Sequence, residues 1–161
     1  VQLLGLMIEN ITNEDLQSYY ERVLFNPLGM DSTTLFKDGA GNYQVYGGAR
    51  TTAQDAAQVG LLMLNGGKVN GQQIVSTHWI EKSIAPSKNA PYYGYLWWLD
   101  NNSKNKNYAA TGDYGQLTIV FPGLDLVFLR KQQCEKPRGQ NMTWMGPAFL
   151  KKISDLVTAY Y

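Results

Sequence analysis

The stretch AATGDYGQLTIVFPGLDLVFLRKQ, residues 109–132, decides the fold class. Two runs rich in apolar and β-branched residues, at about 115–121 and 124–131, flank a Pro-Gly pair, which is typical of antiparallel strands joined by a tight turn. A further strand is predicted at about 108–111, so we expect a sheet of about three strands. The segment Thr111-Gly112-Asp113-Tyr114 precedes the hairpin, and it fits either an ordinary turn or one wall of an active site.

Outward from this sheet, the hydrophobic spacing predicts helices before it and one helix after it. Residues 93–99 are aromatic and strand-like. The first predicted helix, at about 2–10, should be largely buried, and the second runs from about 16 to a stop at Asn26-Pro27. Two more helices are predicted at 53–64 and after Ser76-Thr77. The last is predicted at about 145–159, with one apolar face made of Phe149, Ile153, Leu156 and Val157. Residues 31–50 and 132–142 are expected to be loops, with a tight turn at Asn70-Gly71. This order of elements predicts an α+β fold.

The composition narrows the classes of function. The chain has 161 residues, of which 44% are hydrophobic and 17% charged, as in a folded globular protein. A net charge of +1 without a basic cluster argues against nucleic acid as a partner, and the apolar runs are too short for a membrane span. Cys134 and His78 are the only cysteine and histidine, so we expect no disulfide, no metal site and no cofactor.

Several residues have ordinary structural interpretations. His78, at a helix start, is expected on the surface, because no Gly-x-Ser-x-Gly elbow supports a catalytic triad. Asp55 is interpreted as part of a helix cap that begins at Thr52. The aromatic residues at 92–98 allow sugar stacking, but strand alternation would place about half of them in the core.

Five segments, in this order, carry a resemblance to a known family. They are FNPLGMDST (25–33), YGGARTTAQDAAQVG (46–60), NGQQIV (70–75), YGYLWW (93–98) and GDYGQ (112–116). The set resembles the serine β-lactamase-like superfamily, which includes class C β-lactamases, penicillin-binding-protein-like carboxypeptidases, esterases and 6-aminohexanoate-dimer hydrolases. The resemblance extends over about residues 3–131.

The resemblance implies a fold, an activity and a site. Residues 1–90 would be part of the helical subdomain, and residues 91–161 would supply antiparallel strands and the C-terminal helix of the α/β subdomain. Members transfer acyl groups through a serine nucleophile, so the substrate would be a small amide or ester. By resemblance, Thr111, Gly112 and Tyr114 would bind substrate, and the backbone N–H of Asp113 would be the oxyanion-hole donor. Ala110 stands where the lactamases have lysine.

The sequence also departs from the family pattern. We expect the chain to lack the Ser-x-x-Lys nucleophile motif altogether, and no Tyr-x-Asn motif occurs in it. We therefore expect a C-terminal fragment of a serine hydrolase that is inactive alone; the alternative is a nucleophile-less pseudoenzyme or binding module of the same fold. An open edge at 124–131 predicts that the fragment self-associates or pairs with the missing N-terminal half. The resemblance suggests a periplasmic or secreted location, which the sequence itself does not assign.

Overall fold

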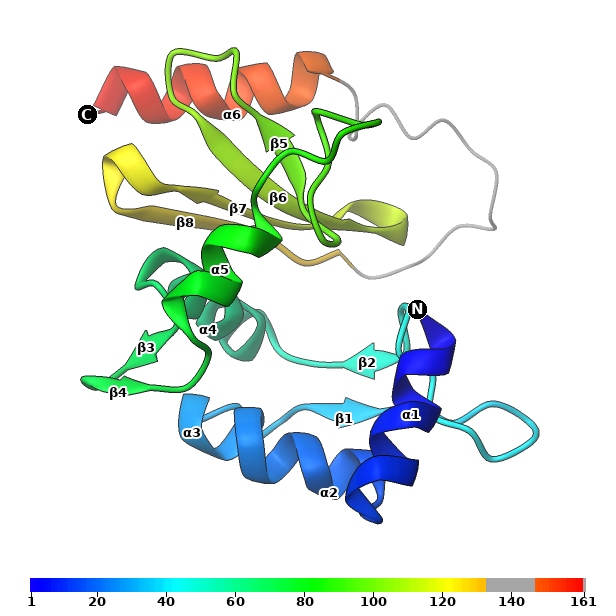
Figure 1. Ribbon diagram of the computed structural model, residues 1–161. Helices are drawn as coiled ribbons and strands as arrows, with labels where there is room; N and C mark the ends of the chain where they lie inside the picture. Colours follow the sequence, from blue (N-terminus) through cyan, green and yellow to red (C-terminus); the bar gives the residue numbers. More distant parts are fainter. Residues whose placement is uncertain (133–146, 161) are drawn as a thin grey trace.

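An antiparallel sheet forms the centre of the computed structural model, which describes residues 1–132 and 147–160 (Figure 1). The sheet has four strands rather than about three, in the order β5-β6-β7-β8. They are β5 Trp98–Asp100, β6 Asn107–Gly112, β7 Gln116–Phe121 and β8 Leu126–Arg130. The aromatic run at 93–99 thus forms a strand only from Trp98 onward, and the short 3-10 helix Pro122–Leu124 makes the turn between β7 and β8.

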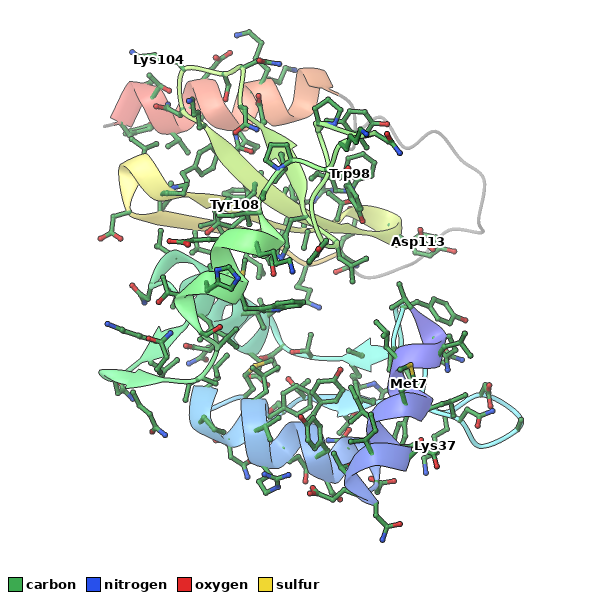
Figure 2. The ribbon with its side chains drawn as sticks, in the orientation of Figure 1. Met7, Lys37, Trp98, Lys104, Tyr108 and Asp113 are labelled. Atoms are coloured by element: carbon green, nitrogen blue, oxygen red, sulfur yellow. The ribbon has the colours of Figure 1, made fainter. Side chains whose placement is uncertain are left out.

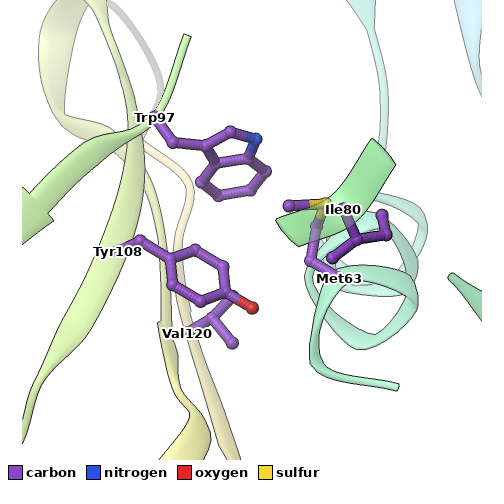
Figure 3. Packing of buried hydrophobic residues seen from close by; sticks show 5 residues of the cluster. All are labelled: Met63, Ile80, Trp97, Tyr108 and Val120. Atoms are coloured by element: carbon purple, nitrogen blue, oxygen red, sulfur yellow. The ribbon is translucent and has the colours of Figure 1, made fainter. Parts of the chain in front are cut away.

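Alternation along β7 gives the sheet two apolar faces. Leu117, Ile119 and Phe121 are buried in a cluster with Ile153 of α6 (Pro147–Tyr160). Val120 faces the other way, into a cluster with Met63, Ile80, Trp97 and Tyr108 (Figure 3). Figure 1 shows α6 on one face of the sheet, and α4 (Ala53–Leu64) and α5 (Thr77–Ser83) on the other.

The last helix starts near its predicted position, but its buried face is narrower than expected. Ile153 is 9% exposed and Val157 packs against the same cluster, as predicted. Leu156 is 57% exposed, so its assignment to this face is wrong. The side chain of Phe149 and most of the expected loop at 132–142 lie outside the described residues.

Helix α4 approaches the sheet closely at Gly60. A Cβ atom built on this glycine would lie 2.6 Å from Cγ1 of Val127 and 3.1 Å from Cγ2 of Thr118. On its other side α4 shares a cluster with the preceding helical segment, in which Leu62 packs with Phe25 and Met30. The helix therefore joins the sheet to the N-terminal helices.

The second helix continues beyond its predicted stop. It consists of α2 (Leu16–Tyr20), a π-helical turn (Glu21–Phe25) and α3 (Asn26–Leu28), and it ends at Gly29 with φ 67°. The N–H of Asn26 bonds to the carbonyl of Glu21, five residues earlier. We attribute the error to this wider turn, which lets Pro27 follow although it has no N–H to donate.

The first helix, α1 (Gln2–Thr12), is not largely buried. Only Gly5 is buried, against Val45 and Leu16, whereas five apolar side chains are exposed: Leu3, Leu4, Leu6, Met7 and Ile11. Helical periodicity predicts a face that gains from burial, but it does not show that the described part of the chain supplies the partner. The expectation of a buried helix is therefore wrong for most of its apolar residues.

Two short hairpins complete the fold. The region 31–50, expected to be a loop, contains β1 (Thr34–Leu35), which pairs with β2 (Ala49–Arg50). The turn predicted at Asn70-Gly71 is confirmed; both residues have positive φ, and they join β3 (Lys68–Val69) to β4 (Gln72–Gln73). In residues 1–132 and 147–160, no helix is long and apolar enough to cross a membrane, and no group of three or more His, Cys, Asp or Glu residues is placed to hold a metal ion.

Candidate functional site

The residues predicted to form the site lie together where β6 turns into β7. Thr111 pairs with Leu117 and Gly112 pairs with Gln116, and a 3-10 turn, Asp113–Gly115, closes the hairpin. Tyr114 has φ 60° and ψ 24°, which is a left-handed backbone conformation. Such a conformation is uncommon for a residue with a bulky side chain, and strained residues of this kind are concentrated at functional sites.

The turn is accessible from solvent. Asp113 is exposed, Thr111, Gly112 and Tyr114 are half-buried, and only Gly115 is buried. Figure 2 shows Asp113 at one end of the sheet. The geometry is thus compatible with the predicted cleft wall, while the roles of these four residues in binding and catalysis stay predictions.

Gln116 occupies part of the space next to Gly112. A Cβ atom on Gly112 would lie 3.2 Å from Cβ of Gln116, and Nε2 of Gln116 donates to the carbonyl of Gln132 at 2.6 Å. Gln116 therefore links this turn to the chain that follows β8. No role was predicted for Gln116, because its position opposite Gly112 depends on the pairing of β6 with β7, which the structure gives.

The expectation that the chain has no Ser-x-x-Lys spacing is wrong, because one occurs at Ser103-Lys104-Asn105-Lys106. Ser103 lies in the loop between β5 and β6, where its hydroxyl donates to the carbonyl of Asn105 at 2.8 Å. Figure 2 shows Lys104 at the end of the sheet opposite Asp113. This serine is therefore not placed to attack a substrate bound beside Asp113, and the spacing is not the nucleophile motif of that site.

Asp55 does more than cap a helix. The predicted cap at Thr52 is confirmed, since its hydroxyl accepts the N–H of Asp55 at 3.0 Å. The Asp55 side chain is 7% exposed, and its Oδ2 accepts from the N–H of Ser32 at 2.9 Å and from the hydroxyl of Thr33 at 2.8 Å. The carboxylate thus ties the segment after α3 to the start of α4.

These contacts also decide the charge of the carboxyl group. Burial alone would raise the pKa of Asp55, but the hydrogen bonds from Thr33, Ser32 and Thr52 outweigh burial and hold the pKa below its usual 3.8. Asp55 is therefore ionised at neutral pH, with its hydrogen bonds made within the fold.

An apolar pocket of about 340 Å³ lies between the N-terminal helices, α4 and the sheet. Its lining includes Phe25, Met30, Leu35, Val59 and Thr118, and its polar edge includes Thr33 and Thr51. None of the residues 111–114 lines it. The pocket is thus distinct from the predicted oxyanion site.

Most of the aromatic residues near β5 stay on the surface. Trp97 is buried and meets Tyr108 edge to face, with ring centroids 5.3 Å apart. Tyr92, Tyr95 and Trp98 are exposed, so the expected half-and-half division between core and surface is not observed. His78 is exposed as predicted.

Comparison with known proteins gives a consistent family. The family model described as Beta-lactamase matches residues 1–139. The 6-aminohexanoate-dimer hydrolase of Paenarthrobacter ureafaciens is 25% identical over 171 aligned residues, which cover 98% of this chain and 43% of the relative.

Solved structures show the same fold. A Bacillus anthracis protein described as a 6-aminohexanoate-dimer hydrolase superposes with a TM-score of 0.81 at 22% identity, covering 99% of this chain and 42% of that one. A β-lactamase from Mycobacterium bovis superposes with a TM-score of 0.70 at 18% identity, covering 98% and 62%. The chain thus spans less than half the length of the first two relatives. Its fold is part of a β-lactamase-like fold, and because the family model matches most of its length, the chain belongs to the beta-lactamase family.

Proposed function

We propose that the chain is the C-terminal part of a serine hydrolase that cleaves amide or ester bonds through an acyl-enzyme, and that it is inactive alone. The observation that carries the proposal is the exposed turn at 111–114, in a chain of this family that has no Tyr-x-Asn motif and no Ser-x-x-Lys near that turn. The nucleophile and the proton-handling tyrosine would come from further polypeptide. The chain would contribute one wall of the cleft and the oxyanion donor.

Acyl transfer explains what each predicted residue does. A tetrahedral intermediate carries negative charge on the former carbonyl oxygen, and a backbone N–H aimed at that oxygen stabilises it. The N–H of Asp113 has this role in the proposal, and the missing side chain of Gly112 lets the substrate come close to β6. Thr111 and Tyr114 would contact the substrate on either side of these two residues.

The substrate class follows from the residue before Thr111. Ala110 carries no cation that could pair with the carboxylate of a β-lactam, so we propose an amide or ester other than a β-lactam as substrate. The curated relative is named for the hydrolysis of a 6-aminohexanoate dimer, which is a linear amide. This similarity supports amide cleavage over β-lactam cleavage.

A pair of variants tests the oxyanion assignment in the longer polypeptide that carries Ser-x-x-Lys. Asp113→Pro removes the N–H, and the extended backbone of Gly112, with φ −127° and ψ 168°, tolerates a following proline. We expect kcat for p-nitrophenyl esters to fall by roughly 100- to 1,000-fold. The matched variant Asp113→Asn keeps the N–H and should stay within a few fold of the parent. Equal activity of the two variants would show that the N–H is not the donor.

The alternative is a pseudoenzyme or binding module that keeps the cleft without a nucleophile. The absence of Tyr-x-Asn from the 161 residues favours this reading if no further polypeptide exists. The coding sequence upstream of Val1 separates the two. A Ser-x-x-Lys roughly a hundred residues earlier, followed by Tyr-x-Asn, supports the hydrolase, and a start codon near Val1 supports the module. A burst of p-nitrophenol or nitrocefin cleavage by the 161-residue chain itself would contradict the inactive-fragment proposal.

We also propose that the nucleophile-bearing polypeptide packs against three surfaces of this chain. They are the exposed apolar side of α1, the apolar pocket, and the edge of β8, which among the described strands pairs only with β7. Exposed apolar area and an unpaired strand edge both favour association. Without that polypeptide, two copies of the chain should cover these surfaces on each other. A stable monomer in light scattering at micromolar concentrations would count against the proposal.

A further inference from the structure

The segment between α5 and β5 folds into a small tight turn. The N–H of Leu99 donates to the carbonyl of Tyr92 at 2.8 Å, and Tyr93 forms an isolated antiparallel bridge with Trp98. At the tip, the N–H of Gly94 donates to the carbonyl of Trp97 at 2.9 Å. Residues 94–97 therefore form a closed turn that stands at the start of β5.

Leu96 has an unusual backbone conformation within this turn. Its φ is 65°, and among the described residues it is the only aliphatic one with positive φ. The left-handed region is sterically unfavourable for a bulky side chain, so such a residue persists only when its surroundings hold it. Strain of this kind marks a segment whose conformation serves something other than local stability.

The surrounding contacts do hold the turn. The N–H of Tyr95 donates to the carbonyl of Ser83 at 2.8 Å, at the end of α5, and the N–H of Leu96 donates to the carbonyl of Gly94 at 3.1 Å. A Cβ atom on Gly94 would lie 2.2 Å from the carbonyl oxygen of Ser83, so this position requires glycine. Trp97 is anchored in the core against Tyr108.

The held turn presents apolar side chains to solvent. Leu96 is 56% exposed and Tyr95 is 49% exposed. The ring of Tyr95 lies 5.6 Å from that of Trp79, which is itself 49% exposed. The strain at Leu96 thus does not place its side chain in the core; it leaves an apolar side chain exposed next to Tyr95 in the sequence.

The register of the sheet places this turn at the same end of the sheet as the candidate site. Trp98 is opposite Ala109 in the antiparallel pair of β5 and β6, so the start of β5 and the end of β6 lie at the same end of the sheet. Figure 2 shows Trp98 and Asp113 toward the same end of the sheet. The apolar turn and the predicted oxyanion donor therefore lie at the same end of the sheet, on adjacent strands.

Resting on the function proposed above, we infer that Leu96 and Tyr95 form a specificity wall that contacts an apolar chain of the amide or ester substrate. A substrate whose reacting carbonyl lies at Asp113 would extend its acyl chain along this wall. Each methylene that leaves water for an apolar contact raises kcat/KM by roughly fourfold. The wall would therefore select substrates with linear hydrocarbon chains over short ones.

The decisive measurement is the dependence of kcat/KM on acyl length, for p-nitrophenyl esters from acetate to octanoate, with the longer polypeptide. Leu96→Asn keeps the left-handed backbone, which asparagine tolerates, but removes the apolar contact. We expect the octanoate-to-acetate ratio of kcat/KM to fall by 10-fold or more. A loss of folding alone would lower both esters by the same factor, so an unchanged ratio overturns the inference.

Leu156→Asn is the matched control. Leu156 is 57% exposed, like Leu96, but it lies on α6, which covers the other face of the sheet from α4 and α5 (Figure 1). The ratio should be unchanged in this variant. A similar fall in both variants would mean that surface polarity, and not a wall at residue 96, controls the preference.

A binding experiment separates this inference from the proposed activity. Octanamide is titrated into the 161-residue chain and followed by amide shifts in two-dimensional NMR. We expect shifts at Tyr95, Leu96 and Thr111 that disappear in Leu96→Asn. If no ester is hydrolysed by the longer polypeptide but these shifts occur, the proposed function fails and the wall stands. If esters are hydrolysed but octanamide shifts none of these residues, the wall is refuted.

Discussion

Replacing Asp55 with asparagine tests the connection between the segment after α3 and the start of α4. The carboxylate accepts two hydrogen bonds on Oδ2, from the N–H of Ser32 and the hydroxyl of Thr33, and its side chain is 7% exposed. Asparagine keeps the shape and one carbonyl oxygen, but it removes the charge. The change therefore isolates the electrostatic part of the contact.

The magnitude follows from the two bonds. A hydrogen bond to a charged group contributes about 1.5–3 kcal/mol and a neutral one about 0.5–1.5 kcal/mol. The loss is then roughly 1 to 1.5 kcal/mol for each bond, and roughly 2 to 3 kcal/mol for the pair. The carboxylate also lies in the first turn of α4, where a negative charge adds a further few tenths of a kcal/mol or more.

The pH dependence gives the experiment a second readout. Because the folded-state pKa of Asp55 is below 3.8, its contribution is present above that pH and is lost as the pH falls through the folded-state value. The asparagine variant has no such titration. The difference in unfolding free energy between the parent and Asp55→Asn should thus be constant from pH 5 to 8 and shrink below about pH 4.

Urea unfolding followed by tryptophan fluorescence measures both quantities. Asp31→Asn is the control, because Asp31 is exposed and one residue from Ser32, so it removes the same charge from the same region. The reasoning is refuted if Asp55→Asn and Asp31→Asn unfold with the same free energy at pH 7. It is also refuted if the deficit of Asp55→Asn is unchanged at pH 3.

Three further predictions concern the core. Gly60→Val should lower the unfolding free energy by about 1–3 kcal/mol in urea titration, because the new side chain meets Val127; an unchanged midpoint would contradict the close approach of α4 to the sheet. Ile119→Ala, at a fully buried position, should cost about 2–5 kcal/mol in the same assay, and a loss below 1 kcal/mol would mean that the site is poorly packed. Burial raises the pKa of Tyr108 from 10.0 to about 12, so the free energy of unfolding should fall as the pH rises from 10 to 12. The variant Tyr108→Phe should show a smaller fall. An ultraviolet titration in which every tyrosine of the folded chain ionises near pH 10 would refute this prediction.

The sheet was the most predictable part of the fold. In Gln116–Phe121 the apolar side chains are dense enough to cover both faces, and a Pro-Gly turn separates them from the next run. These local patterns predict strands because both the pleat and the turn depend on neighbouring residues. The edge strand β5 was harder to bound, because the aromatic residues before Trp98 bend into a turn that is held by the carbonyl of Ser83 in a different element.

The errors at the N-terminal helices have a common physical cause. Helical spacing in α1 predicted an apolar face but not whether the described chain covers it, and Leu3 and Ile11 are more than 70% exposed. Pro27 predicted a helix end, but the π-helical turn before it let the helix continue. In both cases the outcome depended on bonds and contacts with groups that a local pattern does not contain.

The candidate site also has a part that the sequence indicated and a part that only the structure shows. The family resemblance identified the segment at 111–114, and the roles of its residues stay predictions. The unusual conformation of the turn at Leu96 had no signal in the sequence, because a leucine does not indicate a positive φ. The link between Gln116 and Gln132 likewise spans the ends of two strands.

The sequence alone determined the α+β class, the strands β6, β7 and β8, and the helix starts at Thr52 and Ser76, because these depend on residues close together along the chain. The family followed from an ordered set of five segments spread along the sequence. Only the tertiary structure decided that Asp55 holds the segment after α3, that Lys104 lies at the far end of the sheet from Asp113, and that α1 is left exposed. Each of these depends on which distant groups share a neighbourhood, and that is settled by the packing of the whole chain and not by local spacing.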